Sequence, residues 1–340
     1  MSSNRLNNDA EYYEKRFDPL YSDRKARRKR KVKVVHQAKR EEHDIKHDVA
    51  EITGLEDGLQ ITYQPSKYES GWLLDSLSAF YEQDLISDVL SLVKGGKEAS
   101  VYCCEAAPSV DVEFVAAKIY RPRMFRQLRN DKMYQEGRSL LENEGRKVKE
   151  RDQRLMKAVG QKSAFGAEVS HQSWLLHEYV TLQALYNAGA AVPKPYAVGN
   201  NAILMGYVGD ENIGASPLSE LRLERDEAEV LFGDVMHNIT LMLEHDMIHG
   251  DLSAYNILYW AGKVTLIDFP QVTNLVVNSN ARFILERDIT RVCEYFARQG
   301  VRSDPRQIFF DMWDKYALKR RVERTQEDLE TEIESYDDER

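Results

Sequence analysis

Hydrophobic and polar positions in the first half of the chain alternate in short runs, which is the period of β-strands. Residues 92–106 and 112–120 have the composition of strands, and Gly95-Gly96 interrupts the first run. We expect three strands here, the first two joined by a tight glycine turn. A second strand–turn–strand unit is predicted over residues 192–208, around an Asn-Asn turn.

Apolar residues three and four positions apart, the spacing of helices, dominate the second half of the chain. The same spacing predicts one or two short helices over residues 72–92 and a strongly amphipathic helix over residues 172–188. A hairpin over residues 254–269 is expected to turn at Ala261-Gly262. Three further helices are predicted, at residues 218–247, 282–299 and 305–322.

A strand-rich half followed by a helical half predicts an α+β fold with two lobes and a cleft between them. Charged segments flank and interrupt the lobes, and we expect part of the insert at residues 121–166 to be mobile. The predicted segments are a charged, largely disordered arm (1–50), a helical extension (51–91), an N-lobe with the charged insert (92–208), a C-lobe (209–322) and an acidic tail (323–340).

The composition excludes several classes of protein. With 42% apolar and 10% aromatic residues among 340, the chain can build a core and is not wholly disordered. No apolar run approaches the roughly 18 residues of a membrane span, and the N-terminus lacks the apolar core of a signal peptide. Three cysteines without a C-x-x-C motif exclude a disulfide framework. We therefore expect a cytoplasmic protein without membrane contact. Because Cys103 and Cys104 are neighbours on a predicted strand, we expect one thiol to be buried and the other to be exposed.

Charge is distributed unevenly along the chain, whose net formal charge is −9. Residues 24–33 hold eight basic residues in ten positions, whereas residues 323–340 hold nine acids and two arginines. A basic block can collect the phosphates of a nucleic acid by releasing counterions. It can equally be a solvated arm that binds nothing specific, since no aromatic or groove-reading pattern accompanies it. The sequence is therefore compatible with two interpretations of residues 24–33: a contact with nucleic acid, or a solvated arm without a specific partner.

The strongest chemical signal is a set of oxygen ligands around the predicted hairpin. Asp251 and Asn256 lie at its start and Asp268 follows its second strand. Phosphoryl transfer needs one aspartate to orient the attacking hydroxyl, and an asparagine and a second aspartate to hold Mg²⁺ against the phosphates. Because the ends of a hairpin meet, we expect Asn256 and Asp268 to lie close together.

A lysine and a carboxylate complete this set. Lys118 ends a predicted strand beneath the glycine turn, from which a lysine side chain can reach the α- and β-phosphates. Glu178, on the helix predicted over residues 172–188, is the candidate carboxylate that holds it. The turn at Gly95-Gly96 could also lay backbone N–H groups over phosphates.

Four motifs together resemble those of the RIO family of atypical protein kinases. They are GGKEASVY (95–102), VAAKIYRP (115–122), HGDLSAYNILY (249–259) and LIDFPQ (266–271). The run KIYRPRMF and the charged insert resemble the Rio-one type, whereas DFPQ and NARFILERDI (280–289) resemble the Rio-two type. The resemblance implies a two-lobed protein-kinase-like fold, with a small β-rich N-lobe and a helical C-lobe.

The same resemblance implies roles for individual residues. Lys118 would contact the phosphates, Glu178 would orient it, and Asp251 would be the catalytic aspartate. Asn256 and Asp268 would bind Mg²⁺ or Mn²⁺, and an aspartyl-phosphate on Asp268 is conceivable by analogy with the family. ATP would be held by a phosphate loop (Lys97, Glu98, Ser100), an adenine sandwich (Val101, Ala116, Leu258, Ile267), a residue at the back of the pocket (Met205) and a hinge (Gly206, Tyr207, Val208).

The chain departs from ordinary protein kinases near these residues. Ser253 stands where they carry a lysine two residues after the catalytic aspartate, and Pro270 replaces the glycine after Asp268-Phe269. No Ala-Pro-Glu motif follows. We therefore expect the C-lobe to lack the usual activation segment and the helical subdomain that docks peptide substrates. His249 is expected to brace the loop by hydrogen bonding rather than to transfer protons.

The favoured function is that of an ATP- and Mg²⁺-dependent serine/threonine protein kinase or ATPase, which acts on itself or on a protein partner. The RIO family is associated with pre-ribosome maturation, so the resemblance implies a switch in that process, with ribosomal RNA as a partner of the basic arm. One alternative is a small-molecule phosphotransferase of the aminoglycoside or choline kinase type, which shares H-G-D-x-x-x-x-N. The other is a nucleotide-binding scaffold without catalysis. The residue types argue against it, because all five kinase positions hold residues that can perform the chemistry: Lys118, Glu178, Asp251, Asn256 and Asp268.

Overall fold

The computed structural model describes these residues of the chain: 60–65, 67–96, 98–120, 136, 138, 140–142, 146–147, 159, 164–318 and 320. The predicted basic arm, the acidic tail, Lys97 and most of the charged insert lie outside the described residues. All described residues belong to one unit of the chain, Ala50–Arg340. None of the helices described has the length and apolar character needed to cross a membrane.

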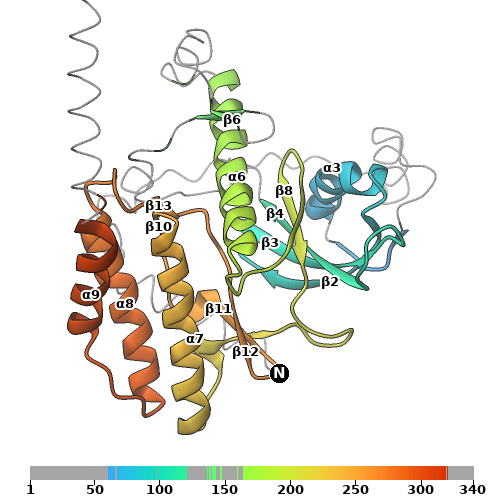
Figure 1. The fold of residues 1–340 in the computed structure, drawn as a ribbon. Coiled ribbons are helices and arrows are strands. Elements are labelled where there is room, and N and C mark those ends of the chain that lie inside the picture. Colours follow the sequence, from blue (N-terminus) through green and yellow to red (C-terminus); the bar gives the residue numbers. More distant parts are fainter. Residues whose placement is uncertain are drawn as a thin grey trace, which may run out of the picture. The chain divides into compact units, whose positions relative to one another are not determined.

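A six-stranded sheet forms the N-lobe (Figure 1). Its neighbouring strands are antiparallel except for β1, which runs parallel to β2 at one edge. In spatial order the strands are β1 (Gln60–Ile61), β2 (Ile86–Gly95), β3 (Ala99–Ala106), β4 (Phe114–Tyr120), β8 (Ala202–Gly206) and β7 (Pro195–Val198). The strands predicted around the Gly-Gly and Asn-Asn turns are confirmed.

The first strand of the glycine hairpin starts earlier than the sequence predicts. Helix α3 (Lys67–Glu82) ends where Asp84 adopts a left-handed backbone with φ 54°, and the N–H of Leu85 donates to the carbonyl of Phe80 at 2.9 Å. β2 then begins at Ile86, so the helix predicted over residues 72–92 is wrong for its last part. The mixed apolar and polar residues there fit both the helical and the strand spacing of apolar positions, and these residues form a strand because they pair with β3.

Helices cover both faces of this sheet around its central strands (Figure 1). On one face Phe80 of α3 packs into an apolar cluster with Tyr102 and other residues of β3, β4 and β8. On the other face α6 (Ala164–Asn187) packs Trp174 against Tyr120, with 4.7 Å between the ring centroids. Because side chains alternate along a strand, every second residue of β3 and β4 lies on the α3 face and the remainder lie on the opposite face.

This two-sided covering explains a wrong prediction about thiols. Cys103 and Cys104 are both buried, although the sequence predicts one exposed thiol. Cys104 lies in the α3 cluster, whereas Cys103, the preceding residue of β3, lies on the opposite face. Burial raises the pKa of the Cys103 thiol to about 11. Like Cys293, both cysteines are free of disulfide bonds.

Three helices side by side form most of the C-lobe: α7 (Arg225–Glu244), α8 (Ala281–Arg298) and α9 (Pro305–Met312). Their apolar faces meet in one core, where Phe296 of α8 stacks edge-on with Phe232 of α7 at 5.3 Å. Asp304 caps α9 by accepting from two backbone N–H groups, with Pro305 at the start of the helix. The helices predicted at residues 218–247 and 282–299 are confirmed, although α7 begins later than predicted. The helix predicted over residues 305–322 is an α-helix only as far as Met312 and continues as a π-helix over Trp313–Leu318.

Short strands complete the C-lobe: β9 (Ser216–Pro217), β10 (Met247–Ile248), β11 (Ile257–Trp260), β12 (Lys263–Leu266) and β13 (Thr273–Asn274). β11 and β12 form the predicted hairpin, whose turn residues Ala261 and Gly262 have φ values of 47° and 79°. β13 pairs with β10. Between Asp268 and α8, where every residue is described, the chain holds only β13 and turns, so this stretch contains no long activation segment.

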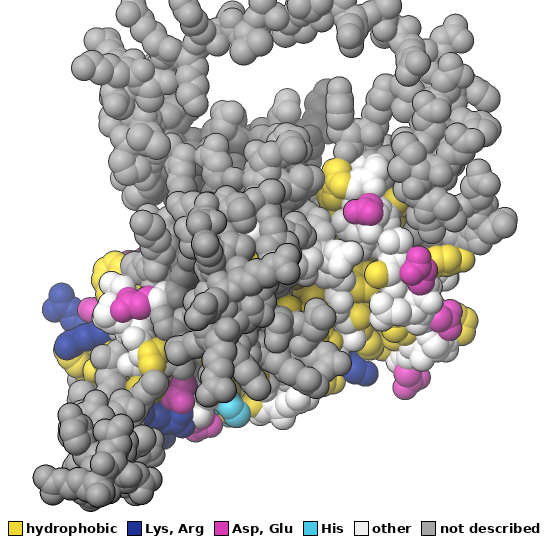
Figure 2. All heavy atoms as spheres, turned by 90° about the horizontal axis from the view of Figure 1, so that it is seen from above, with side chains coloured by type: hydrophobic (Ala, Val, Ile, Leu, Met, Phe, Trp, Pro, Cys, Tyr) yellow, Lys and Arg dark blue, Asp and Glu magenta, His cyan; other side chains and the backbone are white. Residues whose placement is uncertain are grey.

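Charge on the surface differs between the two lobes in one view of the described residues. On the face seen in Figure 2, most of the visible Lys and Arg side chains lie at the C-lobe side, whereas Asp and Glu side chains occur on both sides. Within the insert, the structure describes one small antiparallel pair, β5 (Leu141–Glu142) and β6 (Arg146–Lys147).

Candidate active site

The loop of residues 249–256, here the Asp251 loop, follows a backbone path that requires glycine. Gly250 has φ 85°, and a Cβ atom there would lie 2.2 Å from the carbonyl oxygen of Gln271. Only glycine fits such a close approach. The N–H of Gly250 donates to the buried carboxylate of Asp288 on α8 at 2.8 Å, which fixes the loop to the core of the C-lobe.

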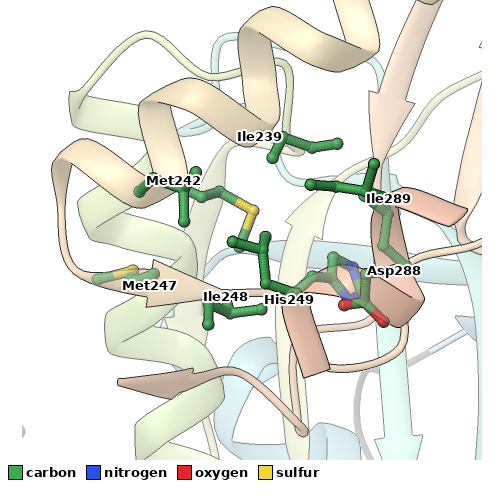
Figure 3. Close-up of a pocket in the computed structure, with 10 residues that line it drawn as sticks. Ile239, Met242, Met247, Ile248, His249, Asp288 and Ile289 are labelled. Carbon is green, nitrogen blue, oxygen red and sulfur yellow. The ribbon is translucent and has the colours of Figure 1, made fainter. Parts of the chain in front are cut away.

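His249 links this loop to the Asp268 loop, residues 267–274. Its Nδ1 atom accepts from the N–H of Asp251 at 3.3 Å, so the ring proton belongs on Nε2, which donates to the carbonyl of Ile267 at 3.1 Å. Figure 3 shows His249 and Asp288 close together beside a small cavity in the C-lobe core. Burial raises the pKa of the Asp288 carboxyl, although His249 and Arg287 oppose this shift. The histidine therefore braces the two loops, as predicted.

The hairpin brings Asn256 and the Asp268 loop together, as its geometry predicts. The N–H of Ile267 donates to the carbonyl of Asn256 at 3.0 Å across the base of the hairpin. The side chain of Asn256 donates from Nδ2 to the carbonyl of Asp251 at 2.9 Å, which leaves Oδ1 as its ligand atom. Asp268 has φ 72°, a left-handed conformation that is uncommon without glycine and that clusters at functional sites.

Lys118 is buried between two carboxylates. Its Nζ atom lies 2.5 Å from Oε1 of Glu178 and 2.6 Å from Oδ1 of Asp268. Tyr120, two residues later on β4, donates from its hydroxyl to Oε2 of Glu178. These groups come from β4, α6 and the Asp268 loop, so the cluster joins the N-lobe to the C-lobe.

The cluster keeps its charges because each buried group has a partner. Burial alone would lower the pKa of Lys118, but Asp268 and Glu178 raise it well above its usual value. Burial favours the neutral form of Asp268, but Lys118 lowers the pKa of that carboxyl below its usual value. Tyr120 stays protonated, since burial and the charge of Glu178 raise its pKa.

Most residues predicted to hold adenine lie near Lys118. Val101 pairs with Lys118 in register, and Ala116 lies two residues earlier on β4, so all three share the face of the sheet opposite α3. Met205 of β8 pairs with Ala116 and lies on that face as well. Two partly buried residues, Leu258 and Ile267, lie on or directly after the hairpin of the C-lobe.

The predicted hinge follows β8 and is held by backbone hydrogen bonds. The N–H of Gly206 donates to the carbonyl of Lys194 at 2.8 Å, and the carbonyl of Val208 accepts from Ala215 at 2.8 Å. Between them, the ring of Tyr207 contacts the ring of Phe114 edge-on, with 6.3 Å between their centroids.

The glycine turn before β3 brings only part of the predicted phosphate loop to the site. The N–H of Gly96 donates to the carbonyl of Ala99 at 2.9 Å, and Glu98 lies within this turn. Lys97 lies outside the described residues. Ser100 is buried and pairs with Ile119, so its side chain lies on the α3 face, away from Lys118.

Arginines of α8 contact the Asp251 loop, and no role was predicted for them from the sequence, although Arg287 lies within the run NARFILERDI (280–289). Arg287 donates to the carbonyl of Gly250 and lies 3.0 Å from Oδ1 of Asp288. Arg291, one turn later, places Nη1 2.9 Å from Oδ1 of Asp251. Their spacing of four residues predicts that both lie on one face of the helix. That spacing does not predict which segment the face contacts, so the sequence gives little indication of their role.

Two described residues of the insert contact the C-lobe and were not predicted either: Arg138 contacts the Asp268 loop and Glu136 contacts the segment just before α8. Arg138 donates from Nη2 to the carbonyls of Pro270 at 2.8 Å and Val272 at 2.5 Å. The carboxylate of Glu136 accepts from the hydroxyl of Ser279 at 2.7 Å, just before α8. No spacing in the sequence connects an N-lobe insert with this loop.

Comparisons with known proteins agree on one family. The sequence model of the RIO domain matches residues 101–308. The Haloferax volcanii RIO-type serine/threonine-protein kinase Rio1 is 32% identical over 219 residues, which are 64% of this chain and 66% of that protein. The Rio2 protein of Methanocaldococcus jannaschii is 32% identical over 161 residues, 45% of this chain and 58% of that protein.

A solved structure supports the fold. The Chaetomium thermophilum Rio2 kinase, in an ADP/Mg²⁺-phosphoaspartate complex, covers 88% of this chain and 86% of its own. The TM-score is 0.52 at 21% sequence identity, so this likeness concerns the fold alone. It agrees with the predicted α+β, two-lobed arrangement.

The ion cluster predicts a pH dependence of stability. Because the folded pKa of Asp268 is lowered, its charge stabilises the fold above the unfolded value of about 3.9, and this contribution is lost as pH falls through the folded pKa. The pKa of Lys118 is raised, so its contribution to stability is kept up to at least about pH 10.4.

We expect the difference in unfolding free energy between wild type and Asp268→Asn, measured in urea, to stay constant from pH 5 to 9 and to shrink below about pH 4. Asp111→Asn, at an exposed position, is the control for overall charge. A difference that is unchanged down to pH 3 would contradict the ion pair.

Proposed function

This chain belongs to the RIO family of serine/threonine kinases, and on that premise we propose that it transfers the γ-phosphoryl group of ATP. The acceptor is a serine or threonine hydroxyl of a protein, which can be the chain itself, or water. One observation carries the proposal. A buried lysine with its carboxylate partner, Lys118 and Glu178, lies against Asp268, and Asn256 ties that loop to Asp251.

In this proposal Lys118 binds the α- and β-phosphates of ATP, and Glu178 holds the lysine in place. The residues fit a divalent cation of the Mg²⁺ or Mn²⁺ type, since Oδ1 of Asn256 and the carboxylate of Asp268 are hard oxygen donors. The cation, when bound, would neutralise charge on the phosphates. Because Lys118 contacts Asp268 directly, ATP and the cation must compete with that ion pair when they enter.

Asp251 orients the acceptor hydroxyl and takes its proton. The acceptor oxygen forms a bond to the γ-phosphorus while the bond from that phosphorus to the bridging oxygen of ATP breaks, and ADP leaves. The hydrogen bond from Asn256 and the brace from His249 hold the backbone of Asp251 during this step. Positioning and charge then supply most of the catalysis, because phosphoryl transfer requires little covalent chemistry from the protein.

Adenine binding follows the same arrangement. Val101 and Ala116 offer an apolar surface from the sheet, and Leu258 and Ile267 offer one from the hairpin. Further contacts are assigned to the back of the pocket, the hinge and the phosphate loop: Met205, Tyr207, Val208, Glu98, Lys97 and Ser100, the last through its backbone.

Family membership favours a protein kinase or ATPase over the two alternatives. A small-molecule phosphotransferase would gain ATP turnover when aminoglycosides or small alcohols are added, which we do not expect here. A scaffold would bind nucleotide without turnover. The short connection between Asp268 and α8 leaves little room there for the ordinary peptide-docking surface, which supports an ATPase switch with modest kinase activity.

Turnover should depend on Asp251. We expect Asp251→Ala to lower the rate of ATP turnover by about 10²- to 10⁴-fold, because the group that positions the acceptor is removed. Nucleotide affinity should stay within a few-fold, since Lys118 and the adenine surfaces remain. Free phosphate and label on the protein are measured together in the presence of Mg²⁺. Equal turnover in wild type and variant would refute the assignment, and the ratio of free phosphate to label separates switch from kinase.

We further propose that Asp268 can itself accept the phosphoryl group. The solved Rio2 relative is a complex with a phosphoaspartate, and 42% of the Asp268 side chain is exposed in this chain. A carboxylate oxygen would attack the γ-phosphorus, ADP would leave, and water would later release phosphate. Label on wild type should then be released by hydroxylamine, unlike phosphoserine or phosphothreonine. Label that resists hydroxylamine would rule out this intermediate.

The basic arm is proposed to bind ribosomal RNA or a pre-ribosome, and the protein is proposed, separately, to be cytoplasmic. Residues 24–33 lie outside the described residues, so the support is their charge alone. Replacing their lysines and arginines by glutamine should weaken binding of a ribosomal RNA fragment and flatten the plot of log affinity against log salt. For each phosphate that the arm no longer neutralises, the slope of that plot should fall by about 0.7 to 0.9. An unchanged affinity and slope would favour the solvated arm.

A further inference from the structure

Arg291 on α8 contacts the aspartate that this chain would use to position the acceptor. Its Nη1 atom lies 2.9 Å from Oδ1 of Asp251. About two fifths of each side chain is exposed, 41% for Arg291 and 44% for Asp251, so the pair is accessible to an entering group. We propose that Arg291 is a positioning residue for phosphoryl transfer, which fixes Asp251 and supplies positive charge on the acceptor side of the site. This inference rests on the proposed function.

The Asp251 loop contains no cation of its own. Its sequence is HGDLSAYN, and Ser253 occupies the position of the lysine that ordinary protein kinases carry two residues after the aspartate. Lys118 cannot serve the acceptor side, because its Nζ atom lies between Glu178 and Asp268. A phosphoryl group in transfer carries spread negative charge, and a fixed cation nearby stabilises it. Arg291 brings that charge from a different element, α8.

The ion pair also leaves the second oxygen of Asp251 available. Oδ1 is held by Arg291, whereas the contact of Oδ2 among the described residues is a long one, 3.4 Å to Nδ2 of Asn256. The guanidinium is a planar fork with five N–H donors, so it can bind Asp251 and still offer donors to an anion beside it. Fixing one oxygen by a charge-assisted hydrogen bond limits rotation of the carboxylate and aims the other at the acceptor.

Arg291 differs in this respect from its neighbour Arg287. The side chain of Arg287 is only 21% exposed, and it holds the Gly250 carbonyl and Asp288, so it stabilises the loop itself. The pair of Arg291 with Asp251 is half-exposed, and such ion pairs contribute little to stability. Removing Arg291 should therefore leave the fold intact and act on the reaction.

The experiment compares Arg291→Ala and Arg291→Lys in the full chain with Arg298→Ala. Arg298 is an exposed arginine on the same helix, seven residues later, and it packs on the ring of Tyr295. We expect Arg291→Ala to lower kcat for ATP turnover by about 10- to 100-fold, with KM for ATP within about twofold. Arg291→Lys should keep part of the rate. Millimolar guanidinium chloride should partly restore Arg291→Ala, with no change in Tm among the variants and no effect on Arg298→Ala.

Each result separates this inference from the proposed function. If wild type and Asp251→Ala turn over ATP equally, the proposed function fails. If turnover depends on Asp251 but Arg291→Ala matches wild type, only the role of Arg291 is overturned. It is also overturned if Arg291→Ala loses activity with a lowered Tm and neither the lysine variant nor guanidinium restores it, because that pattern marks a structural role.

Discussion

The buried ammonium group of Lys118 is the constraint on which the arrangement of the site depends. A charge taken out of water is costly unless it is paired and hydrogen-bonded, so β4, α6 and the Asp268 loop must come together around it. Removing one partner of a buried ion pair costs about 3–5 kcal/mol, because it leaves the other charge uncompensated. This cost applies to the removal of Glu178, which is buried, and we expect a smaller cost for the removal of Asp268, which is partly exposed. The ion pairs of Lys118 with Glu178 and Asp268 therefore join the two lobes, and the same lysine has the charge needed to bind phosphate.

A second constraint acts through the backbone. Gly250 and Asp268 both have positive φ, and neither conformation is favourable for an ordinary residue in an isolated chain. They persist because side chains from elsewhere hold the flanking peptide groups: Asp288 and Arg287 on α8 hold Gly250, and His249 holds Ile267. The C-lobe core thus supports the site, while the site residues themselves lie in loops.

The sequence predicted the parts of this site that local rules determine. A hairpin has a fixed geometry, so the closeness of Asn256 and the Asp268 loop followed from spacing, and the strand composition of residues 112–120 correctly placed Lys118 on a strand of the same sheet as the glycine hairpin. The start of β2 was predicted wrongly because residues 86–92 suit both a helix and a strand, and only pairing with β3 distinguishes them. Arg291 and Arg138 could not be predicted at all, because their contacts join segments that are remote in the chain and no local pattern encodes such a contact.

Arg138 ties one residue of the insert to the loop that holds Asp268. Its two hydrogen bonds hold the carbonyls of Pro270 and Val272, directly after Asp268, so the insert and the Asp268 loop share one set of contacts. Linkage between two such parts is reciprocal: whatever favours one arrangement of the loop favours the matching arrangement of the insert by the same free energy. If the cluster binds nucleotide as proposed and the Asp268 loop shifts when it does so, a partner that contacts Arg138 would change the affinity for nucleotide, and nucleotide would change the affinity for that partner by the same factor.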